Sequence, residues 1–349
     1  MTLSLRRRRA LGALSAAAMA GLVPALRSQA AAPAARITLA VGGRSVHPFR
    51  HLPISVAMQL HFFQAEGLEV LLQDHPTDAQ ALQALHRGAA DVAAVGFENT
   101  LRATGEPGAL RSLVLQTRSP QMALAVSVRA MPRYRQLTDL HRRKIGIPDF
   151  GSLCHSMASK VLAQAGVEPT EVQFVAVGDG ARAVAALRAG QVHALCHCDP
   201  VVALLEHQQV ARVVADARSL AAGQALFGGA VPGACVLAPA LFLQQHAAQA
   251  QALVHGVVHV LKWLQTAAPA DIVKAVPPDG LLAERSLYLA SLARAREAIS
   301  PDGLVPDVGP EAVLRALAVL DPVVAARRPD LSRTYTQEFA RKAKQKFSA

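Results

Sequence analysis

The segment KIGIPDFGSLCHSMASKVLAQAGV, residues 144–167, places a serine, a cysteine and a histidine close together: Ser152, Cys154 and His155. A serine or cysteine nucleophile needs a base within hydrogen-bond reach. Cys154 and His155 are neighbours on an expected first helical turn, so their side chains point about 100° apart and cannot pair. The segment also lacks the lysine of a phosphate-binding loop, and Ser152 lacks the flanking glycines of a nucleophile elbow. The pattern therefore predicts no catalysis at this point.

The same segment is typical of a strand, a glycine turn and the start of a helix. Ser152 is a good N-cap, and the free N–H groups of Leu153, Cys154 and His155 would face the loop. Such a helix start attracts anions or polar ligand atoms without catalysis. Two interpretations stay open: plain capping, and a ligand contact made by Gly151, Ser152 and their neighbours.

A second cluster, VHALCHCDP, contains metal-ligand types. On a strand, Cys196 and Cys198 face one side and His197 faces the other, and Cys-x-Cys is not the usual zinc spacing. We therefore expect no metal. Asp199 follows the strand directly, and open α/β sheets bind ligands at the carboxyl ends of their strands. Asp199 is thus a candidate ligand contact.

Polar residues follow other expected strands as well. Arg118 with Ser119 could clamp a carboxylate or a sulfonate, or Arg118 could be a solvated surface side chain. Glu98 could contact a ligand or could be the favourable acidic charge of a helix N-terminus. Loops rich in histidine and proline follow the first expected strand. The candidates at these strand ends are His47, His51, Pro53, Phe97, Glu98, Arg118 and Ser119.

The elements that would position these residues alternate between strand-length apolar runs and helix-length amphipathic runs. This alternation predicts an α/β fold with mostly parallel sheets and helices on both faces. The halves ALQALHRGAADVAAV and AVAALRAGQVHALCH echo each other, which indicates two similar α/β lobes. From about residue 240 the chain is predicted to be mainly helical. The expected strands cover 36–43, 68–75, 91–97, 112–118, 123–129, 144–150, 171–177, 192–198 and 211–217, and the expected helices before residue 240 cover 54–67, 78–89, 156–166, 180–190 and 201–210.

Composition limits the function classes. The chain has 349 residues, 52% of them apolar, which suffices for two domains with real cores. The formal charge of +11 is inflated by five arginines in the first 35 residues; without them 31 basic residues face 25 acidic ones, leaving +6. No basic run with interleaved aromatics follows, so the sequence disfavours nucleic-acid binding. Four cysteines do not make a disulfide framework in a chain of this size, and their pairing cannot be deduced.

Residues 1–35 have the order of an export signal. A basic start, SLRRRR, precedes an apolar stretch and small residues near SQAAAPAA, with cleavage expected around residues 30–35. Paired arginines resemble a twin-arginine signal, but the general secretory route stays open. A membrane anchor is the alternative, and glycine and proline interrupt the apolar stretch. We expect an exported, periplasmic protein.

Five stretches in order resemble periplasmic substrate-binding proteins of the nitrate/sulfonate/taurine family, which serve ATP-binding-cassette (ABC) importers. These are HLPISVAMQLHFFQAEGLEVLL, ALQALHRGAADVAAVGFENTL, DLHRRKIGIPDFGSLCHSMASKVLAQAGVEPTEVQFVAVG, ALRAGQVHALCHCDPVVALL and LVHGVVHVLKWLQTAAPADIVKAV. The resemblance implies a type II periplasmic-binding-protein fold. One lobe would comprise 36–128 plus 236–349 and the other 129–235, with crossing strands near 123–129 and 234–239.

The resemblance also implies a function. The protein would bind a small organic solute in the cleft between the lobes, close around it by hinge motion, and deliver it to ABC permease and ATPase subunits. It would be a monomer without enzymatic activity, cofactor or metal. Arg118, the helix start and the positive charge favour an anion such as a sulfonate or carboxylate. Glu98, Asp199 and the histidines favour a nitrogen heterocycle.

The resemblance places the candidate residues in the cleft. It implies cleft positions for 47–53, Phe97, Glu98, Arg118, Ser119, Gly151, Ser152 and Asp199. Cys154 and His155 replace the small hydroxyl or amide residues common in relatives, so the solute could differ. The alternative is a thiamine-pyrimidine-synthase-like enzyme on the same fold. Such enzymes carry a cysteine-rich stretch near this chain's CHC, where only Cys196 and Cys198 occur, and an export signal fits a cytosolic enzyme poorly.

Overall fold

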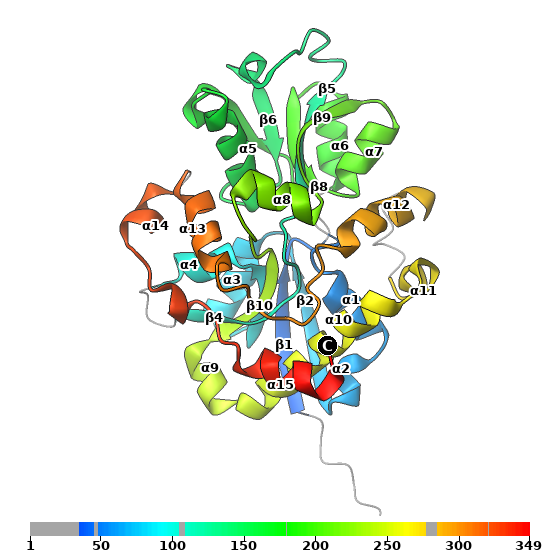
Figure 1. Cartoon of the computed structure of the whole chain (residues 1–349), viewed down its shortest axis with the longest axis vertical. Helices are drawn as coiled ribbons and strands as arrows, with labels where there is room; N and C mark the ends of the chain where they lie inside the picture. The colour runs from blue at the N-terminus through cyan, green and yellow to red at the C-terminus, as the bar shows by residue number, and fades with distance from the viewer. Residues whose placement is uncertain (1–34, 45–47, 105–108, 179, 277–284, 320) are drawn as a thin grey trace, which may run out of the picture. The chain divides into compact units, whose positions relative to one another are not determined.

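A computed structural model describes residues 35–44, 48–104, 109–178, 180–276, 285–319 and 321–349 (Figure 1). Strands and helices alternate through the first two thirds of the described chain, as the sequence pattern predicts, and helices follow (Figure 1). The strands are β1 Ala35–Gly42, β2 Leu68–His75, β3 Val92–Gly96, β4 Leu110–Leu115, β5 Met122–Ser127, β6 Lys144–Ile147, β7 Gln173–Ala176, β8 Ala194–Cys198, β9 Ala211–Ala217 and β10 Ala234–Pro239.

The strands form two five-stranded sheets with the same arrangement. The first has the order β2-β1-β3-β10-β4 and the second β7-β6-β8-β5-β9. In each sheet the central strand, β3 or β8, pairs in parallel with β1 or β6, which in turn pairs in parallel with β2 or β7. On its other side the central strand pairs with an antiparallel strand from the other half of the chain: β10 in the first sheet and β5 in the second. We call the parts built on these sheets the first and second lobes. The predicted α/β fold with two similar lobes is confirmed.

The two crossings lie beside β5 and β10. The chain leaves the first sheet after β4 and enters the second with β5, then returns through residues 228–233 to β10. The expected limit of the first lobe at residue 128 differs from this pairing, because β5 bonds to β8 and β9 of the second sheet. We propose that the lobes divide at residues 116–121 and 228–233.

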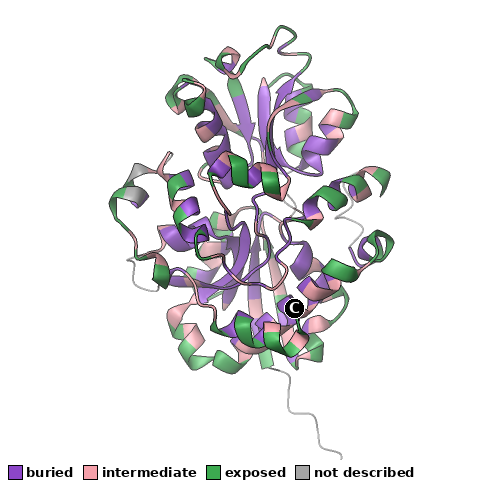
Figure 2. Ribbon diagram, viewed as in Figure 1, coloured by how far each residue is buried: buried purple, intermediate pink, exposed green. Residues whose placement is uncertain are grey.

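Helices cover the sheets, and their buried faces supply the cores (Figure 2). The helix expected over 54–67 is two helices, because His61 adopts a left-handed φ of 58° between them. The helices are α1 Leu52–Gln59, α2 Phe62–Ala65, α3 Asp78–His86, α4 Glu98–Arg102, α5 Leu153–Gln164, α6 Gly180–Arg188, α7 Val201–His207, α8 Leu220–Phe227, α9 Ala240–Gln245, α10 Ala247–Thr266, α11 Pro269–Lys274, α12 Arg285–Arg296, α13 Gly309–Ala318, α14 Pro322–Ala326 and α15 Glu338–Phe347.

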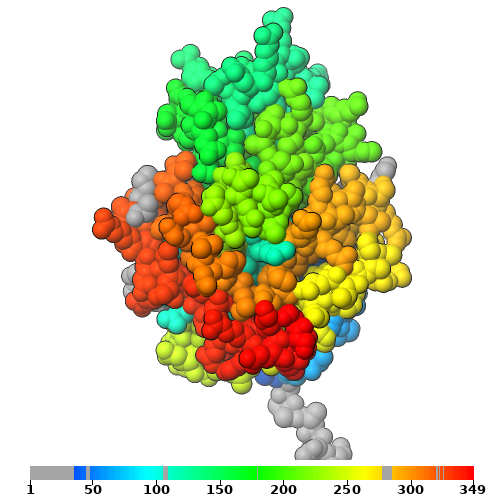
Figure 3. All heavy atoms as spheres, viewed as in Figure 1, coloured from blue at the N-terminus to red at the C-terminus, as the bar shows by residue number. Residues whose placement is uncertain are grey.

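The C-terminal helices pack mainly on the first lobe. The apolar side of α10, with Val254, Val257 and Leu261, joins the same buried cluster as strand β1. Helix α12 belongs to this cluster through Tyr288 and Leu292, yet it also touches α7 of the second lobe. On the face seen in Figure 3 the orange C-terminal segments adjoin the green second lobe. Among the described helices, none has the length and apolarity needed to cross a membrane.

Candidate functional site

A cavity of about 660 Å³ lies between the two sheets and is lined by residues of both lobes. Its walls come from loops that follow β1, β2 and β3 in the first lobe and β6, β7 and β8 in the second, together with the crossings and α12. Carboxyl ends of strands therefore form the site, as open α/β sheets favour. The charged lining residues are Arg44, Arg50, Asp74, Asp78, Glu98, Arg102, Asp149 and Arg182.

Asp78 organises the first-lobe wall. It is the first residue of α3, after the N-cap Thr77. Its Oδ2 accepts hydrogen bonds from Arg50 Nη2 at 2.5 Å, from the Gly96 N–H at 2.8 Å and from Asn99 Nδ2 at 3.1 Å. Burial alone would lower the pKa of Arg50, but Asp78 and Glu98 raise it above its ordinary value. The Asp78 carboxylate thus holds Arg50 at the cavity, and its Oδ2 accepts from three protein donors.

Glu98 differs from Asp78 in its environment. It begins α4, is 3% exposed, and its Oε2 has no hydrogen-bond partner among the described residues. The carboxyl group lies where a side chain on Gly96 would be, since a Cβ on Gly96 would come within 2.1 Å of Oε2. Burial raises the pKa of Glu98 to about 7 against the lowering effect of Arg50. The glycine therefore makes room for a carboxyl group that the fold leaves without a cation partner.

The second-lobe wall is the loop after β6, as the sequence predicted for Gly151 and Ser152. Ser152 caps α5: its Oγ accepts from the His155 N–H at 3.2 Å and donates to the Asp149 carbonyl at 2.8 Å. Gly151 takes a φ of 80°, and its carbonyl accepts a hydrogen bond of 2.7 Å from Arg102 Nη2 of the first lobe. Burial raises the pKa of Asp149 to about 6, with Asp78 adding to the effect.

Cys154 lines the cavity, whereas His155 supports the loop from behind. The hydrogen bond with Cys196 raises the pKa of the Cys154 thiol well above its usual range, the opposite of what a nucleophile needs. His155 packs against the rings of Phe150 and Phe174, and its Nδ1 accepts from the Gly151 N–H at 3.1 Å. Burial, followed by Arg102, lowers the pKa of His155 to about 4.

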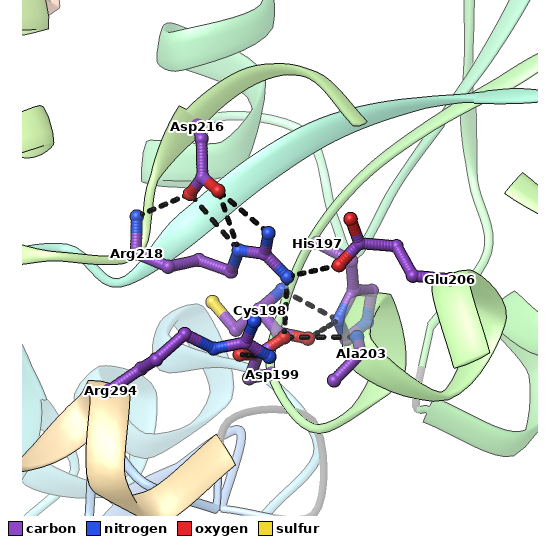
Figure 4. A network of polar contacts seen from close by, with 8 residues as sticks. All are labelled: His197, Cys198, Asp199, Ala203, Glu206, Asp216, Arg218 and Arg294. Carbon is purple, nitrogen blue, oxygen red and sulfur yellow. Dashed lines mark hydrogen bonds and ion pairs between the residues drawn. The ribbon is translucent and has the colours of Figure 1, made fainter. Parts of the chain in front are cut away.

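Asp199 is the centre of a separate ionic network (Figure 4). Its carboxylate is 3.3 Å from Arg218 Nη1 and 3.1 Å from Arg294 Nη2, and it accepts the Ala203 N–H at 3.0 Å. Arg218 also pairs with Glu206 and Asp216. The described lining of the cavity does not include Asp199, so the structure gives this candidate an ionic partner in place of a ligand.

The other candidates divide between the cavity and its supports. Glu98, Gly151, Ser152 and Cys154 line the cavity. Arg118 donates from Nε to the Glu297 carbonyl at 2.9 Å and lines a different, smaller cavity. His51, Pro53, Phe97 and Ser119 are buried in the supporting structure, and His47 lies outside the described residues.

Arg50 lies in the expected cleft segment 47–53, but several other lining residues have no counterpart in the sequence analysis: Asp78, Asn99, Arg102, Asp149 and Tyr288. Asp149 stands directly before Phe150 in the quoted loop, so its position after a strand could have identified it. Tyr288 could not be found this way, because α12 reaches the cavity from a distant part of the chain. In the part of the chain that the structure describes, no three His, Cys, Asp or Glu residues are grouped to hold a metal ion.

The two sheets and the cavity between them define a type II periplasmic-binding-protein fold. The sequence profile described as NMT1/THI5 like matches residues 48–254, and the chain belongs to that family. This confirms the predicted nitrate/sulfonate/taurine-type relationship. No curated protein sequence gives a significant match.

Solved structures agree with this assignment. A protein of Bordetella bronchiseptica RB50 is 36% identical, with a TM-score of 0.84 over 90% of this chain and 98% of that one. The alkanesulfonate-binding protein SsuA of Xanthomonas axonopodis pv. citri, bound to MOPS, is 18% identical, with a TM-score of 0.66 over 87% of this chain and 99% of that one. The nitrate-binding protein NrtA of Synechocystis PCC 6803 is 14% identical, with a TM-score of 0.66 over 89% of this chain and 88% of that one.

Proposed function

We propose that the protein is an extracytoplasmic solute-binding protein that encloses a small organic solute between its lobes and delivers it to an ABC importer. The observation that carries this proposal is the 660 Å³ cavity with walls from both lobes. A solute that contacts both walls favours the closed arrangement, because the open one offers only half of its contacts. The fold of the sulfonate- and nitrate-binding proteins supports the same function.

Contacts between the lobes support closure as the mechanism. Arg102 of the first lobe reaches the Gly151 carbonyl of the second, and Arg294 of α12 reaches Asp199. The Arg294 contact lies beside the crossing at 116–121, where a hinge would bend, because Gln121 Nε2 donates to the Ala295 carbonyl at 2.8 Å. The export signal expected in residues 1–35 supports a periplasmic location, and the permease and ATPase of an importer are the partners that follow from the proposal.

The residues proposed to contact the solute are those that line the cavity. They are Glu98, Gly151, Ser152 and Cys154 from the sequence analysis, together with Arg50, Arg102, Asp149 and Tyr288. The anion hypothesis loses the support of Arg118, which lies elsewhere. Arg102 and Arg182 still favour an anion, but acidic residues of equal number share the lining. Sulfonates, taurine and carboxylates therefore belong in any panel of test solutes.

The test is to express the full chain with its leader, isolate it gently from the periplasmic fraction, and identify what it retains. We expect one small molecule per protein in native mass spectrometry, released unchanged by denaturation. Small-angle scattering should show a larger radius of gyration once that molecule is removed. Absorption in the pyridoxal phosphate band, retained iron, or chemical conversion of the molecule would instead favour the synthase-like enzyme.

A further inference from the structure

The acidic residues on the cavity wall fall into two groups. Asp74 is paired with Arg44 and Asp78 with Arg50. Glu98 and Asp149 form no ion pair with any lysine or arginine that the structure describes. Burying a carboxylate without a cation or donors is costly, so a stable fold normally supplies them. Glu98 Oε2 therefore lacks what the same wall provides for its neighbours, whereas the half-buried Asp149 has a hydrogen bond with the Ser152 side chain but no cation in an ion pair.

Glu98 is held in place for a partner that the protein does not supply. Its side chain is almost fully buried and lines the cavity, and its Oε2 is enclosed without a hydrogen-bond partner among the described residues. The absence of a side chain on Gly96 is what allows this position. Asp149 comes to the same cavity from the second lobe, so the two carboxyl groups stand on opposite walls.

The groups that face these carboxyls do not neutralise them. Arg50, Asp78 and Arg102 act on both, and Asp78 opposes the two arginines. The nearby thiols of Cys198 and Cys235 are buried, and burial raises the pKa of Cys235 to about 12, so that thiol stays uncharged. The surroundings thus leave room for hydrogen-bond donors on the solute.

We propose that the cavity selects a solute with paired N–H donors on a cationic or basic nitrogen centre, such as an amidinium or an amino-substituted nitrogen heterocycle. Glu98 and Asp149 would accept these donors, one from each lobe. A planar pair of N–H groups matches the two oxygens of a carboxylate. An anionic solute would instead place a negative group against both carboxyls. The inference rests on the proposed solute-binding function and names its substrate class.

The test compares benzamidine with benzoate, which have nearly the same shape and opposite charge. Titration calorimetry on the full mature protein at pH 7.5 should show benzamidine binding at least ten times more tightly than benzoate. Binding should release protons, because the amidinium favours the ionised form of Glu98. The heats measured in phosphate and in Tris, which differ in ionisation enthalpy, would report that release.

Matched variants assign the effect to the two carboxyls. Glu98→Gln and Asp149→Asn should each weaken benzamidine binding at least tenfold, and Glu98→Gln should remove the larger part of the proton release. The controls are Glu311→Gln and Asp271→Asn, the same changes at exposed ion pairs outside the cavity, which should leave binding unchanged. Circular dichroism would establish that all four variants fold.

The outcomes separate the inference from the proposed function. Tighter binding of benzoate, taurine or another anion, strengthened by Glu98→Gln, overturns the nitrogen-donor class while solute binding stands. The nitrogen-donor class is also overturned, and solute binding stands, if neither benzamidine nor 2-aminopyridine binds while the isolated protein retains another small molecule. If no probe binds and no molecule is retained, both the inference and the proposed function fail.

Discussion

Glu98 and Asp199 occupy equivalent places in the two lobes and have opposite environments. Each comes within two residues of the end of the central strand of its sheet, β3 or β8; Glu98 begins α4, and Asp199 precedes the N-cap of α7. Both are buried, with 3% and 5% of the residue exposed. Asp199 is enclosed by Arg218 and Arg294, whereas Glu98 lines the cavity and its buried Oε2 has no hydrogen-bond partner among the described residues. One carboxyl group is held in an ionic network, and the other forms no ion pair with a described lysine or arginine.

The cations around the two carboxyl groups account for the difference between them. Burial alone would lower the pKa of Arg218, but Asp216, Asp199 and Glu206 raise it above its ordinary value. That arginine stays charged and fixes Asp199 in its place. At Glu98 burial outweighs Arg50, so the carboxyl takes up a proton near neutral pH. A buried ionisable group with a shifted pKa and no ion pair is a candidate for contact with a ligand.

Removing the Asp199 carboxylate should have the largest effect on the free energy of unfolding. Asp199→Ala leaves Arg218 buried with a missing partner and an unsatisfied Ala203 N–H, and we expect it to lower the free energy of unfolding by about 3–4 kcal/mol. Urea denaturation measures the change. Asp216→Ala, in the same network but on a carboxylate that is 42% exposed, is the control and should cost clearly less. Equal losses would mean that Asp199 is not the centre of the network.

Removing the Glu98 charge should raise the free energy of unfolding, and the size of this increase should depend on pH. The ordinary pKa of 4.5 is raised to about 7 in the folded protein, so folding favours the protonated form of Glu98. Its contribution is fully present below about pH 4.5 and is lost as the pH rises through about 7. The Glu98→Gln variant has no carboxyl group to ionise at this position, so it does not lose this stability as the pH rises. At pH 8 the variant should therefore be more stable than the natural protein by up to roughly 3 kcal/mol.

Urea denaturation of both proteins at pH 5, 6.5 and 8 measures this effect. The two stability curves should nearly coincide at pH 5 and separate towards pH 8. Curves that run parallel over this range would show that Glu98 ionises as freely in the fold as in the unfolded chain. Glu311→Gln, exposed on α13, should follow the natural protein at every pH.

The comparison also explains how far the sequence could predict the site. Of the residues predicted from strand ends, Glu98, Gly151, Ser152 and Cys154 line the cavity, and their contact with a solute stays a prediction. The local pattern could not distinguish Glu98 from Asp199, because the cations that pair with Asp199 come from other parts of the chain: Arg218 follows β9, and Arg294 lies on α12. Arg118 follows a strand as well, but its guanidinium turns to Glu297.

The fold was easier to predict than the site. Alternation of apolar runs is a local signal, and it predicted β2 and β9 with the bounds that the structure has. The short helix α4 was missed, because GFENT has too few residues to show a helical period. Which sheet a crossing strand joins is not encoded locally either. The apolar run of β5 suits the interior of either lobe.

A change at Gly96 should affect binding far more than stability. In Gly96→Ala the new methyl group occupies the place of the Glu98 carboxyl, the far end of a flexible side chain that can turn away. We expect the free energy of unfolding to change by no more than about 1 kcal/mol. Benzamidine affinity should nevertheless fall about as much as in Glu98→Gln. The double variant should lose no more than either single one, and additive losses would show that Gly96 acts on another contact.

Breaking only the contact between the lobes at Asp199 should have the smallest effect on stability. Arg294 is 43% exposed at its side chain, so Arg294→Gln should cost less than about 1 kcal/mol of unfolding free energy, while Arg218 continues to neutralise Asp199. Its effect should appear in the arrangement of the lobes, because Arg294 comes from α12 of the first lobe. Without solute, small-angle scattering should give a larger radius of gyration for the variant than for Arg315→Gln, an exposed control on α13. An unchanged radius would assign the network wholly to the second lobe, and closure would then depend on the solute and Arg102 alone.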